Sequence, residues 1–179
     1  MLLTHPLPED RITDSRARAR SYPPLKLALS LDYHLARARI VARYAGINND
    51  AALDWFKRKL KKAPKALVPS LEYGQALVYL DSKKLDNAEP ILNKLINSDP
   101  TNLFYLDAIS DLNIEKKQPV IAIKELKSAL VRQPNNPVLT INYANALIEN
   151  EDLQKAVHVL QRYTHDNPND TNGWHLLSK

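Results

Sequence analysis

The chain has 179 residues, of which 44% are hydrophobic, with 3 Gly, no Cys and a formal net charge of +5. The lack of Cys excludes disulfides and thiolate metal sites. The scarcity of Gly, with no run of alternating β-branched residues, argues against a β fold. No apolar stretch approaches the roughly 20 residues that a bilayer-spanning helix needs. The opening residues, MLLTHPLPEDR, lack the basic and apolar regions of a signal peptide.

Charge is distributed unevenly along the chain. Residues 1–66 carry 14 Lys and Arg against 6 Asp and Glu, a net charge of +8, whereas residues 67–179 carry 11 against 14. The basic end contains an arginine series from Arg11 to Arg20 and a cluster from Lys57 to Lys65. Such a surface can bind nucleic acid or an anionic membrane. No aromatic residues interleave with the arginines as base stacking would require, so we expect no nucleic acid partner but a solvated or domain-docking face.

The basic end predicts three helices. Glu9–Ser21 is expected to be the first, since acidic residues stand in its first turn and arginines toward its end, as the helix dipole favours. Tyr22-Pro23-Pro24 ends it, because proline cannot continue a helix. The second is predicted from Leu25 to about Ala45. The third is predicted to run from Asp50, its cap, to about Lys62.

The rest of the chain repeats with a period of 34 residues. Each repeat has an alanine, a leucine four residues later and a proline eight residues after that: Ala88, Leu92 and Pro100; Ala122, Leu126 and Pro134; Ala156, Leu160 and Pro168. A period of 34 is typical of the tetratricopeptide repeat (TPR), a helix–turn–helix unit that buries its apolar face by stacking on its neighbours. The small alanine lets the two helices approach closely, and the proline ends the second helix.

These patterns predict an all-α protein, an α-solenoid of TPR helix–turn–helix repeats with an extra N-terminal helix. The predicted segments are a linker with the first helix, a degenerate first repeat, three regular repeats and the truncated start of another: residues 1–24, 25–68, 69–102, 103–136, 137–170 and 171–179. Trp174 stands where the TPR pattern usually has Trp. Since the chain stops within that unit, we expect it to be a piece of a longer protein.

In a TPR stack, the first helix of each unit lines a concave groove. Four positions of this helix usually face inward, and we predict the groove residues from them: Tyr73, Leu77, Leu80, Phe104, Asp107, Asp111, Ile141, Asn145 and Ile148. Apolar, acidic and amide side chains together would suit an extended or helical peptide with apolar anchors. Some of the apolar ones could instead pack against the adjacent unit.

The start of the chain resembles a known family. Thr4-His5-Pro6 followed by Arg11-Ile12, then Asp14–Ala19 and Tyr22, is similar to a stretch of the HtpX-like zinc metalloproteases. In one branch, the periplasmic β-barrel assembly-enhancing proteases, this stretch leads into a TPR array. The resemblance implies that residues 1–24 are the tail of a protease domain and that the protein is periplasmic. Its implied partners are outer-membrane β-barrel proteins, their assembly complex and the chain's own protease domain.

The resemblance also bears on zinc. Such enzymes need an H-E-x-x-H helix, and none of the five histidines of this chain stands in that pattern. We therefore expect no enzyme activity and no cofactor in these 179 residues, with Zn²⁺ bound by the parent protease. The resemblance implies that His5 is an extra, regulatory zinc ligand in the parent, since an imidazole can fill the open position of a catalytic zinc. Alternatively, His5 only orders the turn before Pro6.

Two functions remain open on the sequence alone. The first is a protein-interaction module of a periplasmic zinc metalloprotease, which binds substrates or the outer-membrane assembly machinery. The second is a stand-alone cytosolic TPR scaffold. An H-E-x-x-H motif encoded upstream of this segment would distinguish them. A nucleic-acid-binding helical protein is a third reading, and it predicts binding that weakens steeply with salt.

Overall fold

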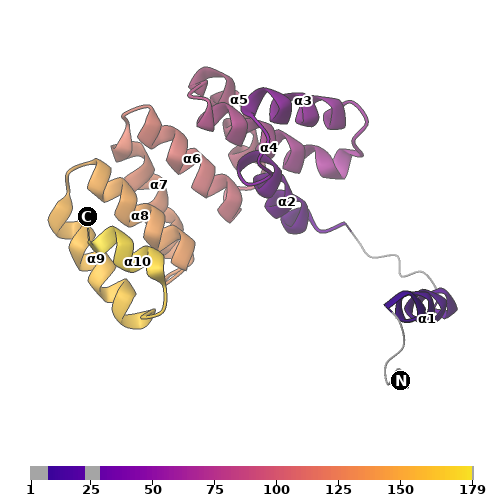
Figure 1. Cartoon of the computed structure of the whole chain (residues 1–179). Helices are drawn as coiled ribbons and strands as arrows, with labels where there is room; N and C mark the ends of the chain where they lie inside the picture. Colours follow the sequence, from indigo (N-terminus) through magenta and orange to yellow (C-terminus); the bar gives the residue numbers. More distant parts are fainter. Residues whose placement is uncertain (1–7, 23–28, 179) are drawn as a thin grey trace.

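A computed structural model describes residues 8–22 and 29–178, so the predictions for residues 1–7, His5 among them, lie outside the described residues. Every described element is a helix, as predicted (Figure 1). The elements are α1 (Pro8–Ser21), α2 (Leu31–Arg43), α3 (Asn49–Leu60), the 3₁₀ turn η1 (Lys65–Leu67), α4 (Val68–Asp81), α5 (Leu85–Ser98), α6 (Leu103–Glu115), α7 (Pro119–Arg132), α8 (Pro137–Glu149), α9 (Leu153–Asp166) and α10 (Thr171–Leu177).

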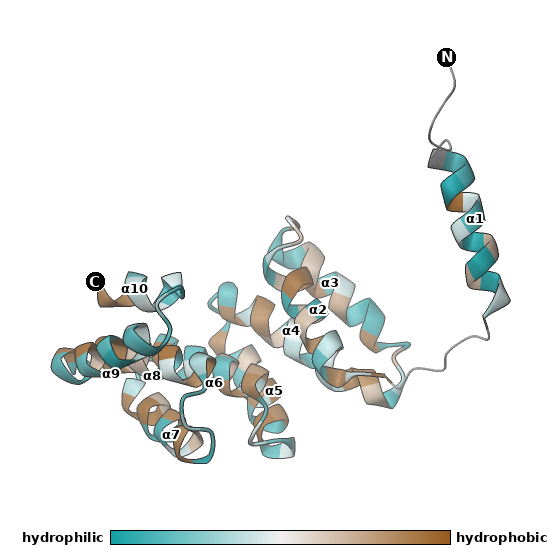
Figure 2. Cartoon of the chain, turned by 90° about the horizontal axis from the view of Figure 1, so that it is seen from below, coloured by the Kyte–Doolittle hydropathy of each residue, from teal (hydrophilic) through white to brown (hydrophobic). Residues whose placement is uncertain are grey.

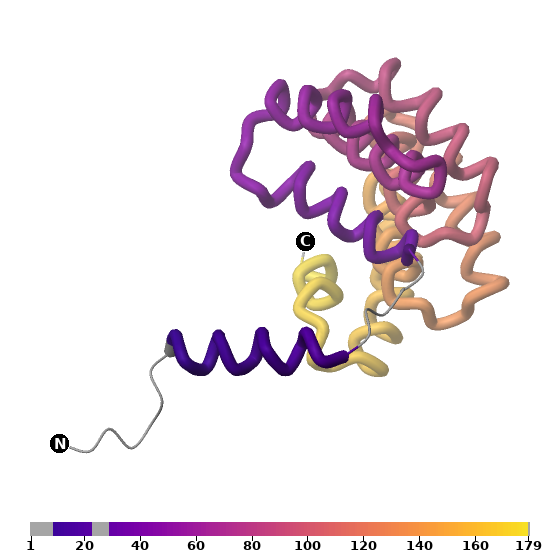
Figure 3. The backbone as a smooth tube through the Cα atoms, turned by 90° about the vertical axis from the view of Figure 1, so that its right-hand side faces the viewer, coloured from indigo at the N-terminus to yellow at the C-terminus, as the bar shows by residue number. Residues whose placement is uncertain are grey.

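The helices from α2 onward form a stack of hairpins. Each helix packs against the next along the chain, and α2, α4, α6 and α8 also pack in succession against one another. Figure 3 shows the backbone winding from α2 to α10 as a curved stack. In Figure 1, α1 lies apart from this stack. Its residues 9–21 are exposed, and it is almost entirely hydrophilic in Figure 2.

The 34-residue pattern forms the core of the stack. Its alanines and leucines are fully or almost fully buried: Ala88, Ala122, Ala156, Leu92, Leu126 and Leu160. The second helices α5, α7 and α9 end at Ser98, Arg132 and Asp166, each two residues before a repeating proline. Proline therefore marks each bend between units because it has no N–H with which to extend the helix.

A close approach joins α3 to α4. Phe56 of α3 is fully buried and lies over Gly74 of α4, so that a Cβ atom at position 74 would stand 2.3 Å from the ring. Ala38 of α2 borders the same point, at 3.1 Å from that Cβ position. Glycine is required here because the aromatic ring occupies the space of a side chain. The first hairpin thereby docks tightly on α4.

Two helix starts differ from the prediction. Leu29 and Ser30 are not helical, and α2 begins at Leu31 because the Ser30 side chain caps it by accepting a hydrogen bond from the Tyr33 amide at 3.3 Å. The predicted start at Leu25 lies outside the described residues. Asn48, not Asp50, caps α3, since its Oδ1 accepts from the Ala51 amide at 2.8 Å. A short polar side chain outside the helix proper is needed for this bond, and Asp50 already lies within α3.

The same turn joins the two helices of each regular unit. Lys83, Lys117 and Glu151, again 34 residues apart, adopt the left-handed conformation with φ of 56°, 59° and 61°. The amide of the following residue reaches back to a carbonyl in the last helical turn, as when Gln118 N donates to Asn113 O at 2.8 Å. This closure usually employs glycine, because a side chain is strained at positive φ.

We predict that Lys117→Gly stabilises the chain by about 0.5–1 kcal/mol, because glycine adopts the left-handed conformation without the penalty of a Cβ atom. Urea unfolding followed by circular dichroism measures the change. The matched control is Lys124→Gly, which places the same substitution inside α7 and should destabilise by about 0.5–1 kcal/mol. Changes of the same sign at both positions would contradict this account of the turn.

Candidate functional site

A polar network crosses the face that the first helices of the units share. Arg39 of α2, Tyr73 of α4 and Asp107 of α6 stand 34 residues apart, at equivalent positions of three units. Arg39 Nη1 donates to Asp107 Oδ2 at 2.5 Å and lies 3.4 Å from the Tyr73 hydroxyl. Asn142 Nδ2 of α8 donates to the other Asp107 oxygen at 2.8 Å. Side chains of four successive first helices therefore meet at one carboxylate.

A second arginine strengthens the crossing one turn further along α2. Arg43 donates to both oxygens of Asp81, from Nε at 3.1 Å and from Nη2 at 3.0 Å. Its Nη2 also lies 3.4 Å from Asp111 Oδ2 on α6. The two groups together form what we call the inner-face network: Arg39, Arg43, Tyr73, Asp81, Asp107, Asp111 and Asn142.

The network keeps its arginines charged although they are partly buried. Burial acts to lower the pKa of Arg39, but the charge of Asp107 and its hydrogen bond outweigh burial and raise the pKa above its ordinary value. Burial opposes the charge of Arg43 in the same way, and the pKa of this residue is raised by Asp81 and Asp111. Tyr73 stays neutral, because burial raises the pKa of its hydroxyl.

Asp111 is the weakly held acid of the network. Burial raises the pKa of its carboxyl to about 6, and the nearby charge of Asp107 acts in the same direction. Arg43 acts against this rise but lies 3.4 Å away and also serves Asp81. Asp111 therefore titrates in a range where most carboxylates are already ionised.

The network corrects the predicted groove at α4. Tyr73 and Leu77 are 0% exposed and Leu80 is 3% exposed, so none of the three is available to a ligand. The arginines of α2 reach across α4 to the acids of α6, and the α4 side chains between them are covered. Tyr73 also packs edge to face on Phe104, with ring centroids 5.8 Å apart.

The other predicted groove residues are divided between the network and an accessible strip. Asp107 and Asp111 are engaged by the arginines of α2. Phe104 is half-buried beside Tyr73. Ile141, Asn145 and Ile148 are also half-buried, and we call these three residues the α8 strip. The strip is the part of the predicted groove that the network leaves accessible.

Sequence reasoning missed Arg39, Arg43 and Asn142. The two arginines occupy groove positions in the degenerate first unit, 34 residues before Tyr73 and Leu77. Extending the period backward would have placed them on the same face. Asn142 stands beside the predicted Ile141 and had no comparable signal.

The described residues offer no metal centre. Within 8–22 and 29–178, no three His, Cys, Asp or Glu side chains are grouped so as to hold an ion. The described part of the chain therefore does not fit a catalytic zinc. Across the same residues, no helix has the length and apolar character to cross a membrane.

We predict that Arg39→Met destabilises the chain by about 1–3 kcal/mol, because it removes a charged partner of the largely buried Asp107 while keeping most of the side-chain volume. Urea unfolding measures the loss. Arg37→Met, on an exposed position of the same helix, is the control and should change stability by less than about 0.5 kcal/mol. An equal loss in both variants would show that the network contributes nothing.

We predict a pH-dependent contribution from Asp111. Its pKa is raised from 3.8 to about 6 on folding, so the folded chain binds the proton more tightly. The resulting stability is fully present below about pH 4 and is lost as the pH rises through about 6. Relative to Asp111→Asn, the wild type should therefore lose unfolding free energy across this window.

The control for this titration has the opposite sign. Hydrogen bonds from Thr101 lower the pKa of Asp99, so its contribution is present at higher pH and is lost as the pH falls below about 4. Urea unfolding of Asp99→Asn and Asp111→Asn over the same pH range compares the two. A wild-type minus Asp111→Asn difference that is flat between about pH 4 and pH 7 would contradict the assignment.

Known proteins resemble the chain in sequence along its whole length. The tetratricopeptide repeat family matches residues 114–179. A Vibrio cholerae protein provisionally named β-barrel assembly-enhancing protease is 66% identical over all 179 residues, which correspond to 37% of that protein. The β-barrel assembly-enhancing proteases of Yersinia pestis and Escherichia coli K12 are each 37% identical over the whole chain. The chain thus spans a little over a third of the length of these relatives.

Solved structures resemble the chain in fold. A thermophilic TPR protein of Thermus thermophilus has a TM-score of 0.61 at 21% identity, over 76% of this chain and 74% of that one. MamA (AMB-1) has a TM-score of 0.54 at 17% identity, over 94% and 90%. The chain is therefore a tetratricopeptide-repeat region, similar throughout its length to part of the β-barrel assembly-enhancing proteases.

Proposed function

We propose that the chain is the protein-binding region of a larger zinc-dependent metalloprotease in the periplasm of a Gram-negative bacterium. The observation that carries the proposal is the 66% identity, over the entire chain, to a relative named as a protease. The relatives are named for β-barrel assembly and come from Gram-negative bacteria, which supports an envelope location. Zinc binding and peptide hydrolysis belong in this proposal to the part of the protein outside these residues.

The face of the first helices supports a binding role. The inner-face network holds the first half of the stack rigidly, and the α8 strip presents two isoleucines and an amide at its other half. An extended or helical segment of an unfolded protein could place apolar side chains on Ile141 and Ile148 and a backbone group on Asn145. The names of the relatives suggest outer-membrane β-barrel proteins, or the complex that assembles them, as the partners.

We predict that Ile141→Lys with Ile148→Lys weakens binding to such partners at least about tenfold, because it places charges where apolar contacts form. The purified chain is titrated with a purified outer-membrane β-barrel protein diluted from urea and, separately, with the purified β-barrel assembly complex. Val120→Lys with Val131→Lys is the matched control, since these valines are 64% and 79% exposed on α7. Equal affinities of the two double variants, or no binding of either partner, would refute this role.

A second measurement addresses the parent protein. In cells, an antibody against the chain should detect a product several times larger than the 20.3 kDa of these residues, released with the periplasmic fraction. A cytosolic product of about 20.3 kDa would instead support the stand-alone scaffold.

A further inference from the structure

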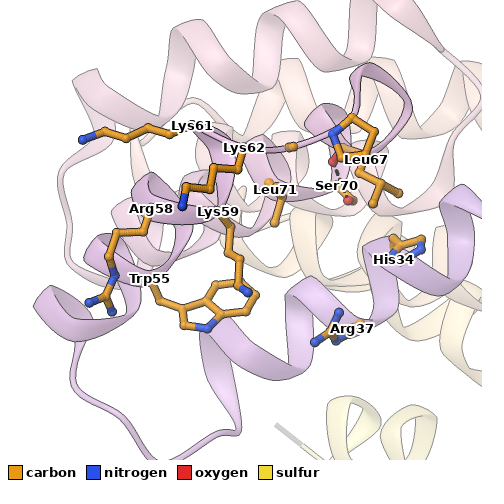
Figure 4. A pocket seen from close by; sticks show the side chains of 12 residues that line it. His34, Arg37, Trp55, Arg58, Lys59, Lys61, Lys62, Leu67, Ser70 and Leu71 are labelled. Atoms are coloured by element: carbon orange, nitrogen blue, oxygen red, sulfur yellow. Dashed lines mark hydrogen bonds between the residues drawn. The ribbon is translucent and has the colours of Figure 1, made fainter.

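The basic end of the stack contains a pocket away from the inner-face network. It has a volume of about 760 Å³ and lies between α2, α3 and the turn that leads into α4 (Figure 4). Trp55, Leu67 and Leu71 form its apolar part. Figure 4 shows Trp55 and Lys59 of α3 on one side, with His34 and Arg37 of α2 across from them. We call this the basic pocket.

The charge around the basic pocket has one sign. Five cationic side chains line it and no carboxylate does: Arg37, Arg58, Lys59, Lys61 and Lys62. None of the five takes part in an ion pair with any residue of the described ranges, whereas Arg39 and Arg43 on the same helix α2 are both paired. Lys59 Nζ lies 5.6 Å from the centre of the Trp55 ring. Cations gathered around a hollow with low-dielectric walls focus a positive potential into it.

We propose that the basic pocket binds an acidic peptide segment that carries an apolar anchor residue. The apolar floor lies in a hollow whose volume suits a few side chains, and the cations surround it at the rim. This arrangement complements an apolar side chain flanked by carboxylates. A membrane is a poorer fit, since a flat lipid surface that met the rim would leave the hollow floor uncovered. The site is separate from the α8 strip and would give the chain a second, charge-selective contact.

Trp55 provides a direct measurement of occupancy. The chain has two tryptophans, and Trp174→Phe leaves Trp55 as the only one. The probe is the capped peptide Glu-Glu-Asp-Leu-Phe-Glu-Asp-Glu, which contains no tryptophan. Titration should change the Trp55 emission to saturation, and raising the salt from about 0.05 M to about 0.3 M should weaken binding several-fold through screening. Peptides with amides in place of the acids, or with Ser-Ser in place of Leu-Phe, should each bind at least about tenfold more weakly.

A matched pair of variants assigns the binding to the pocket. Arg58→Ala, Lys61→Ala and Lys62→Ala together should weaken the acidic peptide at least about tenfold while leaving Lys59 over Trp55. Lys124→Ala, Lys127→Ala and Arg132→Ala remove the same charge from α7 and should change affinity less than about threefold. Circular dichroism verifies that both triple variants are folded.

Three outcomes would overturn the proposal. The first is an unchanged Trp55 emission at saturating peptide. The second is an equal loss of affinity in the two triple variants. The third is binding to vesicles of equal phosphatidylglycerol and phosphatidylcholine through the same three residues, without binding of the peptide, which would assign the pocket to a membrane surface. The Ile141→Lys, Ile148→Lys variant should bind the peptide normally, so that failure at the α8 strip and failure at the basic pocket are distinguishable.

Discussion

The ion pair between Arg39 and Asp107 is the contact on which the inner face depends. Repeat proteins are usually stabilised by contacts within a unit and with the next unit. This pair instead joins helices of the first and third units, separated by 68 residues, and Asn142 extends it to the fourth. Because Asp107 is largely buried, loss of either neighbour leaves a poorly solvated charge. The four units are thus coupled by one carboxylate in addition to their apolar core.

This coupling divides the surface of the stack into regions with different chemistry. The arginines of α2 cover Tyr73 and Leu77, so the first half of the inner face is a closed polar structure. Accessible apolar groups begin at the α8 strip. The neighbouring lysines and arginines of the first hairpin have no acids to pair with among the lining residues, and they surround a hollow of their own. One helix, α2, therefore contributes to two surfaces: Arg39 and Arg43 to the inner face, and Arg37 to the basic pocket.

Sequence reasoning succeeded where a residue's environment is determined within its own unit. The alanine and leucine of each repeat are buried because they face the other helix of the same hairpin, and each second helix ends two residues before its proline. It failed where the environment depends on distant side chains. Tyr73 and Leu77 occupy groove positions, but whether they are accessible is decided by Arg39 and Arg43, in a unit too degenerate to align by its motif. The caps differ for a local reason, since Ser30 and Asn48 each offer a polar side chain one residue before the helix proper.

The equivalent placement of arginine, tyrosine and aspartate in three successive units has a consequence for modularity. Solenoid units of equal length can in principle be reordered or duplicated, because each presents the same packing surfaces to its neighbours. Here Arg39, Tyr73 and Asp107 give each unit an address, since only this order places the cation and the anion on either side of the phenol. Exchanging the second and third units would bury a carboxylate directly beside α2 and move the tyrosine away from it. The array has the regular length of a repeat protein but a sequence of units that is not interchangeable.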